Sequence, residues 1–326
     1  MKTKYLIVGG GLSGLAMALM CQKAEEDFIL VESREEIPDT NIHYFHEDIS
    51  SATGIKLRKV DIIHTCYFQG SFINEPSIGL MNLFSKVTTG MIYQNSMKYI
   101  DGKLKQGFVP VFPIISTGRE MAKKLNYGCM NGKLVSIIEP GIAKIEIPHN
   151  ECEIEYDRMI STIPLPAMLR IVGFTEQQTD VFKTKELKVS EIKFREKLFH
   201  DIWQIIYLPE AIGGYARLSI LGNRIVAEGG DGFYAPSEEK LDDLKRLLRN
   251  VIPTMMGDIS IATQVNPYGR YLPVDESIRE ESLNNLEKFR ITALGRYAEW
   301  SYRRAEDSIN RAKVILKAFE KPKGLI

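Results

Sequence analysis

Three glycines near the N-terminus have the spacing that phosphate-binding turns use. They lie in the run Gly9-Gly-Gly-Leu-Ser-Gly14. Gly9 permits a tight turn, Gly11 lets the backbone approach a pyrophosphate, and Gly14 lets a helix pack closely against a strand. The N–H groups at the start of the following helix would then face the phosphates. Leu12 and Ser13 complete this predicted cofactor turn.

An acidic residue follows the glycine turn at the distance expected for ribose recognition. The apolar run Phe28-Ile-Leu-Val31 ends at Glu32, which lies 18 residues past Gly14. A carboxylate in this place accepts hydrogen bonds from ribose hydroxyls and disfavours a 2′-phosphate. The alternative is a glycine-rich turn in an ordinary βαβ unit. The order of strand, turn, helix, second strand and terminal acid favours dinucleotide binding.

Other polar residues have types that could act on a substrate. His43 and His46 lie among aromatic residues. They could contact a ring cofactor or polarise a substrate, or they could form only a hydrogen-bonded strand end. Arg217 follows a Gly-Gly-Tyr-Ala turn. It could clamp a carboxylate or phosphate through two parallel hydrogen bonds, whereas a surface arginine beside a local carboxylate would have the same sequence.

Aromatic residues in the C-terminal third give two further candidates. Tyr297 flanks an expected buried strand and is interpreted as a substrate-facing aromatic, although aromatics in such places also serve the core. Arg270 and Tyr271 lie between Pro267 and Pro273. This arrangement predicts a loop that closes on the cofactor, while prolines beside aromatics also simply rigidify turns.

The apolar periodicity predicts the elements that must position these residues. A strand over 4–8, a helix over 12–23 and a strand over 28–31 enclose the glycine turn. The same criteria predict strands over 133–138, 143–147, 156–160, 201–208, 215–221, 224–228 and 291–295, and helices over 119–125, 237–251 and 307–319.

The composition bounds the class of protein. A chain of 326 residues with 44% hydrophobic and 26% charged residues is typical of a globular protein with two lobes. Basic and acidic residues balance at 42 each, so the net charge gives no nucleic-acid footprint. No apolar stretch approaches the roughly 20 residues of a membrane span. The four cysteines lack a metal-ligand or disulfide pattern. These features predict a soluble, cytoplasmic protein with no metal site.

Together the motifs resemble the group of FAD enzymes that includes flavin amine oxidases, protoporphyrinogen oxidase, phytoene desaturases and UDP-galactopyranose mutase. The segments that carry the resemblance are the 9–14 turn with Glu32, residues 112–118, residues 156–166 and residues 294–309. The resemblance implies an α/β fold, with a Rossmann-like FAD-binding domain of the glutathione-reductase type and an inserted α+β substrate domain. FAD is the implied cofactor.

The resemblance also implies which residues hold FAD outside the glycine turn. In such enzymes a C-terminal Gly-Arg strand precedes a helix whose N-terminus faces the flavin, where backbone amides stabilise negative charge on the reduced ring. The matching positions are Gly295, Arg296, Asp307, Ser308 and Ile309. Ser33, Thr162 and Val135, the last through backbone atoms at the adenine, complete the implied set.

The resemblance extends to the mutase branch of the group. Residues 43–46 resemble its histidine motif, and residues 207–211, 215–217 and 295–302 resemble its substrate strands and C-terminal signature. The implied catalytic residues are His43, His46, Arg217 and Tyr297, and the implied substrate-binding residues are Tyr207, Arg217, Arg270 and Tyr271. The sequence departs from the pattern because the usual Gly-Gly segment is missing after Glu32 and the chain is shorter than typical members.

The expected organisation is a noncontiguous FAD-binding domain and a substrate domain. The first comprises residues 1–54, 111–170 and 289–326, and the second residues 55–110 and 171–288. The leading interpretation is an FAD-dependent oxidoreductase that resembles flavin amine oxidases and transfers a hydride from a small-molecule substrate to flavin N5. The alternatives are a nonredox isomerase of a nucleotide sugar and a noncatalytic or partner-dependent FAD protein.

Overall fold

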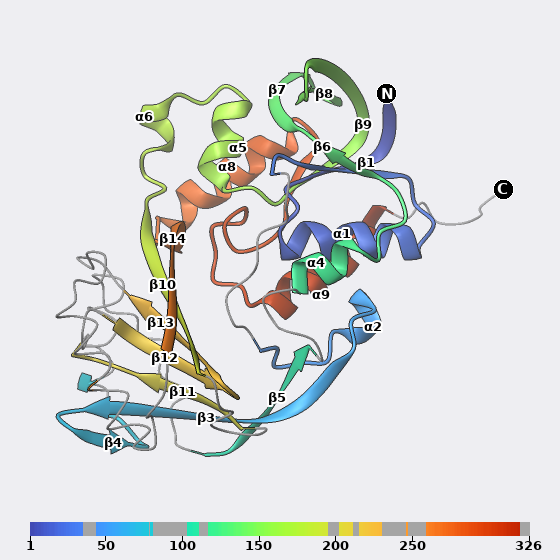
Figure 1. Ribbon diagram of the computed structural model, residues 1–326. Coiled ribbons are helices and arrows are strands. Elements are labelled where there is room, and N and C mark those ends of the chain that lie inside the picture. The colour runs from blue at the N-terminus through green and yellow to red at the C-terminus, as the bar shows by residue number, and fades with distance from the viewer. Residues whose placement is uncertain are drawn as a thin grey trace. The chain divides into compact units, whose positions relative to one another are not determined.

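The protein forms two compact units, each built on one β-sheet (Figure 1). The computed structural model describes residues 1–34, 44–77, 79–80, 103–110, 117–194, 202–210, 215–229, 246 and 259–319. Unit 1 comprises Met1–Arg58, Val109–Lys183 and Pro273–Ile326, and unit 2 comprises Lys59–Phe108 and Thr184–Leu272. The expected helix over 237–251, apart from residue 246, lies outside the described residues.

The sheet of unit 1 joins a parallel part to an antiparallel part. The strands run in the order β6-β2-β1-β9-β8-β7, and β15 pairs with β9. Parallel pairs join β6 with β2, β2 with β1, β1 with β9 and β9 with β15, whereas β7, β8 and β9 pair antiparallel. Their bounds are β1 Lys2–Val8, β2 Phe28–Glu32, β6 Cys129–Asn131, β7 Lys133–Glu139, β8 Ile142–Ile147, β9 Asn150–Ser161 and β15 Ile291–Ala293.

The parallel part of this sheet is built from continuous apolar runs. Tyr5, Leu6 and Ile7 are all fully buried although consecutive residues of a strand face opposite sides. A strand covered on both faces needs such a run, because alternation would place polar side chains in the core. The strands and the helix expected around the glycine turn are therefore confirmed, and Glu32 is the last residue of β2.

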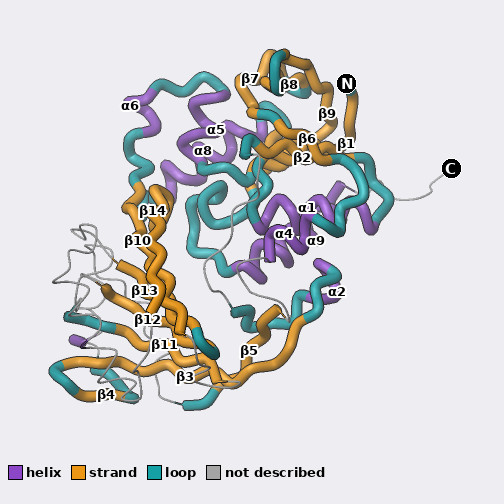
Figure 2. The backbone as a smooth tube through the Cα atoms, viewed as in Figure 1, coloured by secondary structure: helices purple, strands orange, loops and turns teal. Residues whose placement is uncertain are grey.

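Helices of unit 1 lie side by side around the glycine turn. Helix α1 (Leu12–Lys23) packs against α4 (Thr117–Ala122) and α9 (Ala305–Phe319), as Figures 1 and 2 show. The remaining helices of the unit are α2 Ser50–Thr53, α5 Leu165–Ile171, α6 Glu176–Thr179 and α8 Glu276–Glu287. Two have side-chain caps: the Thr175 hydroxyl accepts the Gln178 N–H at α6, and Asp275 accepts the Ser277 N–H at α8.

The sheet of unit 2 is mostly antiparallel. Its strands run in the order β14-β10-β13-β12-β11-β3-β4, with β5 beside β3. The strands β3 and β11 pair parallel, whereas β14, β10, β13, β12 and β11 pair antiparallel in succession, as do β3 and β4. Their bounds are β3 Leu57–Phe68, β4 Ser71–Ile73, β5 Lys105–Pro110, β10 Thr184–Phe194, β11 Ile202–Tyr207, β12 Tyr215–Leu221, β13 Arg224–Gly229 and β14 Ile259–Tyr271. The expected mixture of parallel and antiparallel strands with helices is confirmed.

One expected loop is a strand. Arg270 and Tyr271 pair with Lys185 and Thr184 at the end of β14. The proline at position 267 suggested a loop because proline lacks the N–H that a ladder requires. The ladder is irregular at that place, however, because the register shifts between Lys185 and Leu187. The shift accommodates the proline without ending the strand.

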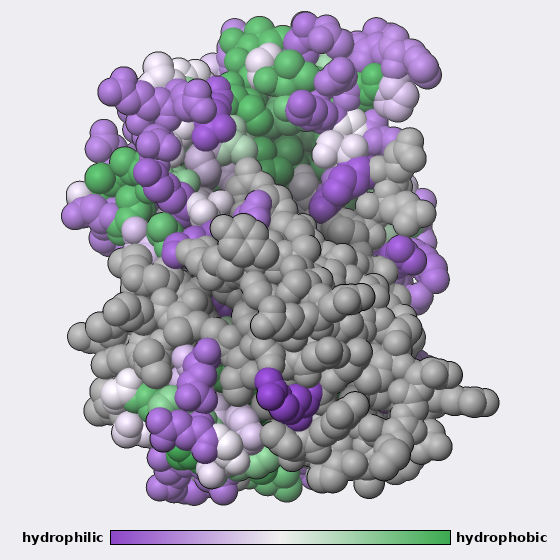
Figure 3. All heavy atoms as spheres, turned by 60° about the vertical axis from the view of Figure 1, so that its left-hand side comes forward, coloured by the Kyte–Doolittle hydropathy of each residue, from purple (hydrophilic) through white to green (hydrophobic). Residues whose placement is uncertain are grey.

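Figure 3 shows hydrophilic residues spread over the described part of one face, with hydrophobic residues between them. Two exposed hydrophobic side chains, Val135 and Ile138, belong to β7 and are 40% and 50% exposed. No helix in the described part of the chain combines the length and the apolar character needed to cross a membrane.

Candidate functional site

Two glycines of the turn, Gly9 and Gly14, have surroundings that leave no room for a larger residue. Gly9 has φ +103° and donates its N–H to the Val31 carbonyl at 2.9 Å. A Cβ on Gly14 would lie 1.9 Å from the Gly9 carbonyl oxygen. The Thr162 hydroxyl lies 3.0 Å from the Val8 carbonyl and 2.9 Å from the Gly9 carbonyl, to which it can donate. The predicted roles of Gly9 and Gly14 in turn and packing therefore have a direct steric basis.

Gly11 differs from the other two motif glycines because the space beside it is open. A Cβ on Gly11 would meet no described atom within 4 Å, and its backbone is extended, with φ −70° and ψ −179°. Gly11 is also the N-cap of α1, where no hydrogen bond from a described side chain caps the helix and no acidic residue occupies the first turn. The first N–H groups and the positive end of the helix dipole therefore remain available for an anion.

Glu32 is already engaged at the end of β2. Its Oε2 accepts the Gly10 N–H at 2.6 Å, and both oxygens accept from the Arg34 guanidinium, at 2.8 and 2.9 Å. The Arg34 backbone N–H donates to Oε1 at 3.0 Å. Burial raises the pKa of the carboxyl, but the hydrogen bonds from Arg34 and Gly10 outweigh it and hold the pKa below the ordinary value. The carboxylate is thus fixed in its ionised, accepting form beside the turn.

The C-terminal segment reaches the glycine turn at Gly295. Gly295 has φ +103°, and a Cβ there would lie 2.6 Å from the Ser13 hydroxyl oxygen. The preceding Leu294 N–H donates to the Ser161 carbonyl at 2.9 Å, at the end of β9. The Ser161 hydroxyl is buried and has no hydrogen-bond partner among the described residues. Segments from both ends of the chain therefore meet at the first turn of α1.

The start of α9 organises the residues expected near the flavin. Asp307 accepts the Arg304 N–H at 2.8 Å, so its carboxylate serves the helix start. The Ser308 hydroxyl lies 3.3 Å from the Arg304 carbonyl, and the Ile309 side chain is fully buried. The Arg296 guanidinium donates to the Arg303 carbonyl at 2.9 Å and lies over the Tyr302 ring. These side chains mainly stabilise the segment itself.

The remaining predicted residues of unit 1 are spread over several elements. His46 donates its backbone N–H to the buried Glu306 carboxylate at 2.9 Å, whereas His43 lies outside the described residues. The Tyr297 carbonyl accepts the Leu165 N–H at 2.9 Å. Ser33 is exposed just after β2. Val135 lies where the pairing of β7 with β8 shifts register.

Two predicted substrate residues of unit 2 form part of what we call the polar row: His64, Tyr207, Arg217 and Glu228. Tyr207 lies opposite Arg217, and Arg217 lies opposite Glu228, in the ladders of β11, β12 and β13. Residues directly opposite in a ladder share one face of the sheet. Nδ1 of His64 and the Tyr207 hydroxyl share a hydrogen bond at 3.2 Å, and Arg217 forms an ion pair with Glu228.

The polar row combines buried and accessible members. His64 and Glu228 are buried, whereas the Arg217 side chain is 31% exposed. The buried members hold the more accessible ones in place. Arg270 and Tyr271 lie two strands beyond Glu228, on β14.

Sequence reasoning missed several residues that the structure brings to these places. Arg34 lay two positions after the predicted acid, so its proximity to Glu32 was a usable signal. Glu228 and His64 lie on strands whose register the sequence does not reveal. Glu299, in the loop after Gly295, and Glu306, in the first turn of α9, are buried carboxylates, and no local pattern distinguishes them from surface acids.

Two further properties of the described residues bear on chemistry. No group of three or more His, Cys, Asp or Glu side chains among them is arranged to hold a metal ion. All four cysteines are free thiols. Burial raises the pKa of Cys21 and of Cys66 to about 12, so neither is a thiolate nucleophile near neutral pH.

Neither a scan against protein-family models nor a search of curated proteins finds a match to this chain. Solved structures do match. A reduced UDP-galactopyranose mutase is similar with a TM-score of 0.70 and 12% identity, over 98% of this chain and 96% of that chain. A protein assigned as a protoporphyrinogen oxidase from Exiguobacterium sp. gives 0.64 and 11%, over 98% of both chains.

A putrescine oxidase bound to putrescine is also similar, with a TM-score of 0.64 and 11% identity, over 97% of this chain and 99% of that chain. Identities of this size show the fold alone. The three matched proteins are members of the group that the sequence motifs resemble. The predicted resemblance to the flavin amine oxidase-like group is therefore confirmed for the fold.

Proposed function

We propose that the protein is a flavoenzyme that holds FAD on unit 1 and acts on a small molecule. The observation that carries the proposal is the open space at Gly11, beside an α1 N-terminus that no described side chain caps. A pyrophosphate needs both a close backbone approach and unpaired N–H donors. At Gly9 and Gly14 a side chain would clash with neighbouring residues of the protein, whereas no described atom lies within 4 Å of a Cβ at Gly11. Packing among the described residues therefore does not explain why position 11 is a glycine.

The residues around the turn match the other parts of the cofactor. Glu32, kept ionised, would accept the ribose hydroxyls in place of the Arg34 guanidinium, because Gly10 and Arg34 together occupy the acceptor positions of its carboxylate in the structure. Gly295, Arg296 and the first turn of α9 would face the flavin, where the N–H groups of the helix start favour negative charge. When bound, FAD would supply a ring that accepts a hydride. The protein's part is to orient the ring and substrate and to exclude water.

We propose further that unit 2 is an inserted substrate domain. It is assembled from two separate chain segments, Lys59–Phe108 and Thr184–Leu272, between parts of unit 1. The Tyr207 hydroxyl and the Arg217 guanidinium of the polar row would bind polar groups of the substrate. Hydride transfer from a small-molecule substrate to the flavin is the leading reaction. It is supported by the likeness of the fold to a putrescine oxidase bound to putrescine.

The cofactor proposal is tested by reconstitution. The purified protein should bind FAD, seen as visible flavin absorbance or as quenching of flavin fluorescence during titration. Gly11→Val and Glu32→Ala should weaken binding, because the first fills the open space and the second removes the ribose acceptor. Gly79→Ala is a matched control, since among the described residues a Cβ there would approach only the Ser77 hydroxyl oxygen, at 3.9 Å. A wild-type protein that is colourless and cannot be reconstituted would sink the proposal.

A second reaction, the nonredox isomerisation of a nucleotide sugar, is supported by the pairing of Tyr207 with Arg217. A guanidinium beside a phenol suits a phosphate group, and one similar structure is a UDP-galactopyranose mutase. The two reactions separate in anaerobic mixing of the FAD-loaded protein with amines or with a UDP-sugar. Bleaching of the flavin by an amine supports oxidation. Turnover of the sugar only after prior reduction, without net oxidation, supports isomerisation, and no response to either favours a noncatalytic protein.

A further inference from the structure

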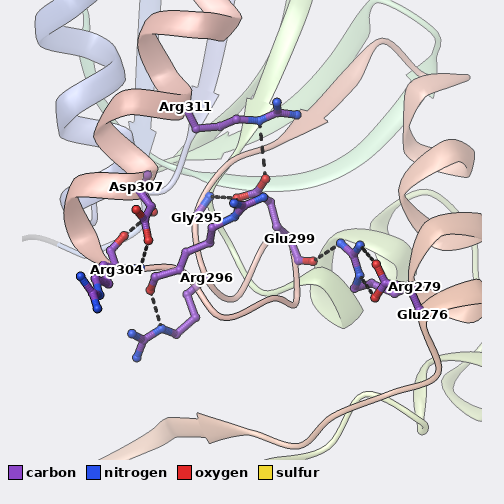
Figure 4. A network of polar contacts seen from close by, with 10 residues as sticks. Glu276, Arg279, Gly295, Arg296, Glu299, Arg304, Asp307 and Arg311 are labelled. Atoms are coloured by element: carbon purple, nitrogen blue, oxygen red, sulfur yellow. Dashed lines mark hydrogen bonds and ion pairs between the residues drawn. The ribbon is translucent and has the colours of Figure 1, made fainter. Parts of the chain in front are cut away.

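Glu299 is a buried carboxylate that controls both backbone groups of Gly295 (Figure 4). Its Oε2 accepts the Gly295 N–H at 3.3 Å, and its own N–H donates to the Gly295 carbonyl at 2.8 Å. Gly295 has φ +103°, a conformation in which only glycine is free of steric cost. One residue therefore holds the glycine in its left-handed conformation from both sides.

Three arginines hold Glu299 in turn. Arg303 Nε lies 3.4 Å from Oε2, and Arg311 Nε, on α9, lies 3.7 Å from Oε1. Arg279, on α8, donates to the Glu299 carbonyl at 3.2 Å. A carboxylate that is only 6% exposed needs such partners, because burying an uncompensated charge is costly. Glu299 is thus fixed by the helices on both sides of its loop.

The far side of Gly295 contacts the glycine turn. A Cβ on Gly295 would lie 2.6 Å from the Ser13 hydroxyl oxygen and 3.2 Å from the Ser13 Cβ. Ser13 belongs to the first turn of α1, whose N–H groups have no intrahelical partners. The position of Gly295 therefore sets how closely the C-terminal segment approaches the anion-binding end of α1.

We propose that Glu299 is a positioning residue for the cofactor. It sets the distance between the Gly295–Arg296 segment and the α1 N-terminus. Both parts can then contact the same bound molecule. The inference rests on the proposed FAD binding. Glu299 acts through Gly295 and does not itself contact the cofactor. For this role the length of the Glu299 side chain, which lets its oxygen accept the Gly295 N–H, matters more than its charge.

Three substitutions separate reach from charge. Glu299→Gln keeps the length and an oxygen acceptor but removes the charge. Glu299→Asp keeps the charge but is one methylene shorter, so it withdraws from the Gly295 N–H. Glu299→Ala removes both. Glu276→Ala is the matched control, because Glu276 is the exposed partner of Arg279 and lies in the same network.

The measurements are the dissociation constant for FAD by titration of apoprotein and the melting temperature with and without FAD. We expect Glu299→Asp and Glu299→Ala to weaken FAD binding about tenfold, the scale of a lost hydrogen bond to a charged group. Glu299→Gln should stay within about threefold and Glu276→Ala should equal wild type. The rise in melting temperature that FAD gives should shrink in the Asp and Ala variants, because ligand stabilisation follows affinity.

The outcomes are distinguishable. If Glu299→Gln binds FAD weakly and Glu299→Asp binds it normally, the proposal is overturned in favour of a charge effect. Lower melting temperatures with unchanged FAD affinity would overturn it in favour of a purely structural role. If Glu299→Ala does not fold, the comparison of Asp with Gln still decides. A wild-type protein that does not bind FAD would overturn the cofactor proposal and this inference together, before any variant is compared.

Discussion

The glycine turn of unit 1 and the polar row of unit 2 are built in opposite ways. The turn uses consecutive residues whose side chains are mostly absent, so its shape comes from backbone conformation and close packing. The row uses large polar side chains brought together by four strands, from His64 on β3 to Glu228 on β13. We therefore expect the free energy of unfolding to fall when side-chain atoms are added to the packed glycines of the turn, and to fall when side-chain atoms are removed from the polar row.

The largest effect is expected within the turn, from Gly14→Ala. The new Cβ would lie 1.9 Å from the Gly9 carbonyl oxygen, a backbone atom that cannot rotate away. We expect the free energy of unfolding to fall by about 3 kcal/mol, the upper range for overpacking. Chemical denaturation measures it. Gly11→Ala in the same turn should change stability by less than about 0.5 kcal/mol, and equal losses for both would contradict the steric account.

The next effect concerns the polar row, where Glu228→Ala removes a buried partner. Breaking a buried ion pair costs several kcal/mol, but Arg217 is 31% exposed and partly screened. We expect a loss of about 2 kcal/mol in the free energy of unfolding. The surface pair of Lys2 with Glu155 is the control, and Glu155→Ala should give no measurable change. A stable Glu228→Ala protein would mean that Arg217 finds another partner.

These two regions also mark what the sequence could and could not predict. The turn, α1 and β2 were predicted because their signals lie within about 30 neighbouring residues and depend on glycine sterics and apolar runs. Tyr207 and Arg217 were singled out as candidates, but their pairing with His64 and Glu228 depends on strand register. Register follows from the whole sheet rather than from local sequence.

The same limit explains the one expected loop that is a strand. The proline before Arg270 and Tyr271 predicted an interruption, and the interruption exists as the shift of register opposite β10. The local signal was correct, but the conclusion that the strand ends there was wrong. Pairing on both sides of the irregularity extends β14 through Tyr271, which only tertiary contacts can determine.

A third prediction tests whether the open space in the turn belongs to a ligand. Gly11→Ala leaves the fold unstrained, because φ −70° suits alanine and no described atom lies within 4 Å of the new Cβ. We expect FAD affinity to fall about tenfold, equivalent to about 1.4 kcal/mol. Fluorescence titration of apoprotein measures it, with Gly79→Ala as the control. An unchanged affinity for FAD would show that the cofactor does not occupy the open space beside Gly11.

The smallest effect concerns the charge beside the turn, through Arg34→Ala. Burial raises the pKa of Glu32, but Arg34 and Gly10 lower it overall, so the folded protein holds the proton less tightly than the unfolded chain does. This contribution to stability is present above the ordinary glutamate pKa of 4.5 and is lost as the pH falls through the folded value. Removing the guanidinium should therefore cost stability at neutral pH and little in acid.

Because the Arg34 side chain is 50% exposed, screening limits the loss at neutral pH to about 0.5 kcal/mol. Denaturation of both proteins at neutral pH and well below the ordinary glutamate pKa measures the difference at each pH. A loss of the same size at both would show that Arg34 stabilises the turn by packing, because an ion-pair contribution disappears once Glu32 is protonated. The Arg34 guanidinium contacts Glu32 through a long polar side chain, as the members of the polar row contact one another. Removing it should therefore lower the stability of the turn in the same way that removing Glu228 lowers the stability of the polar row.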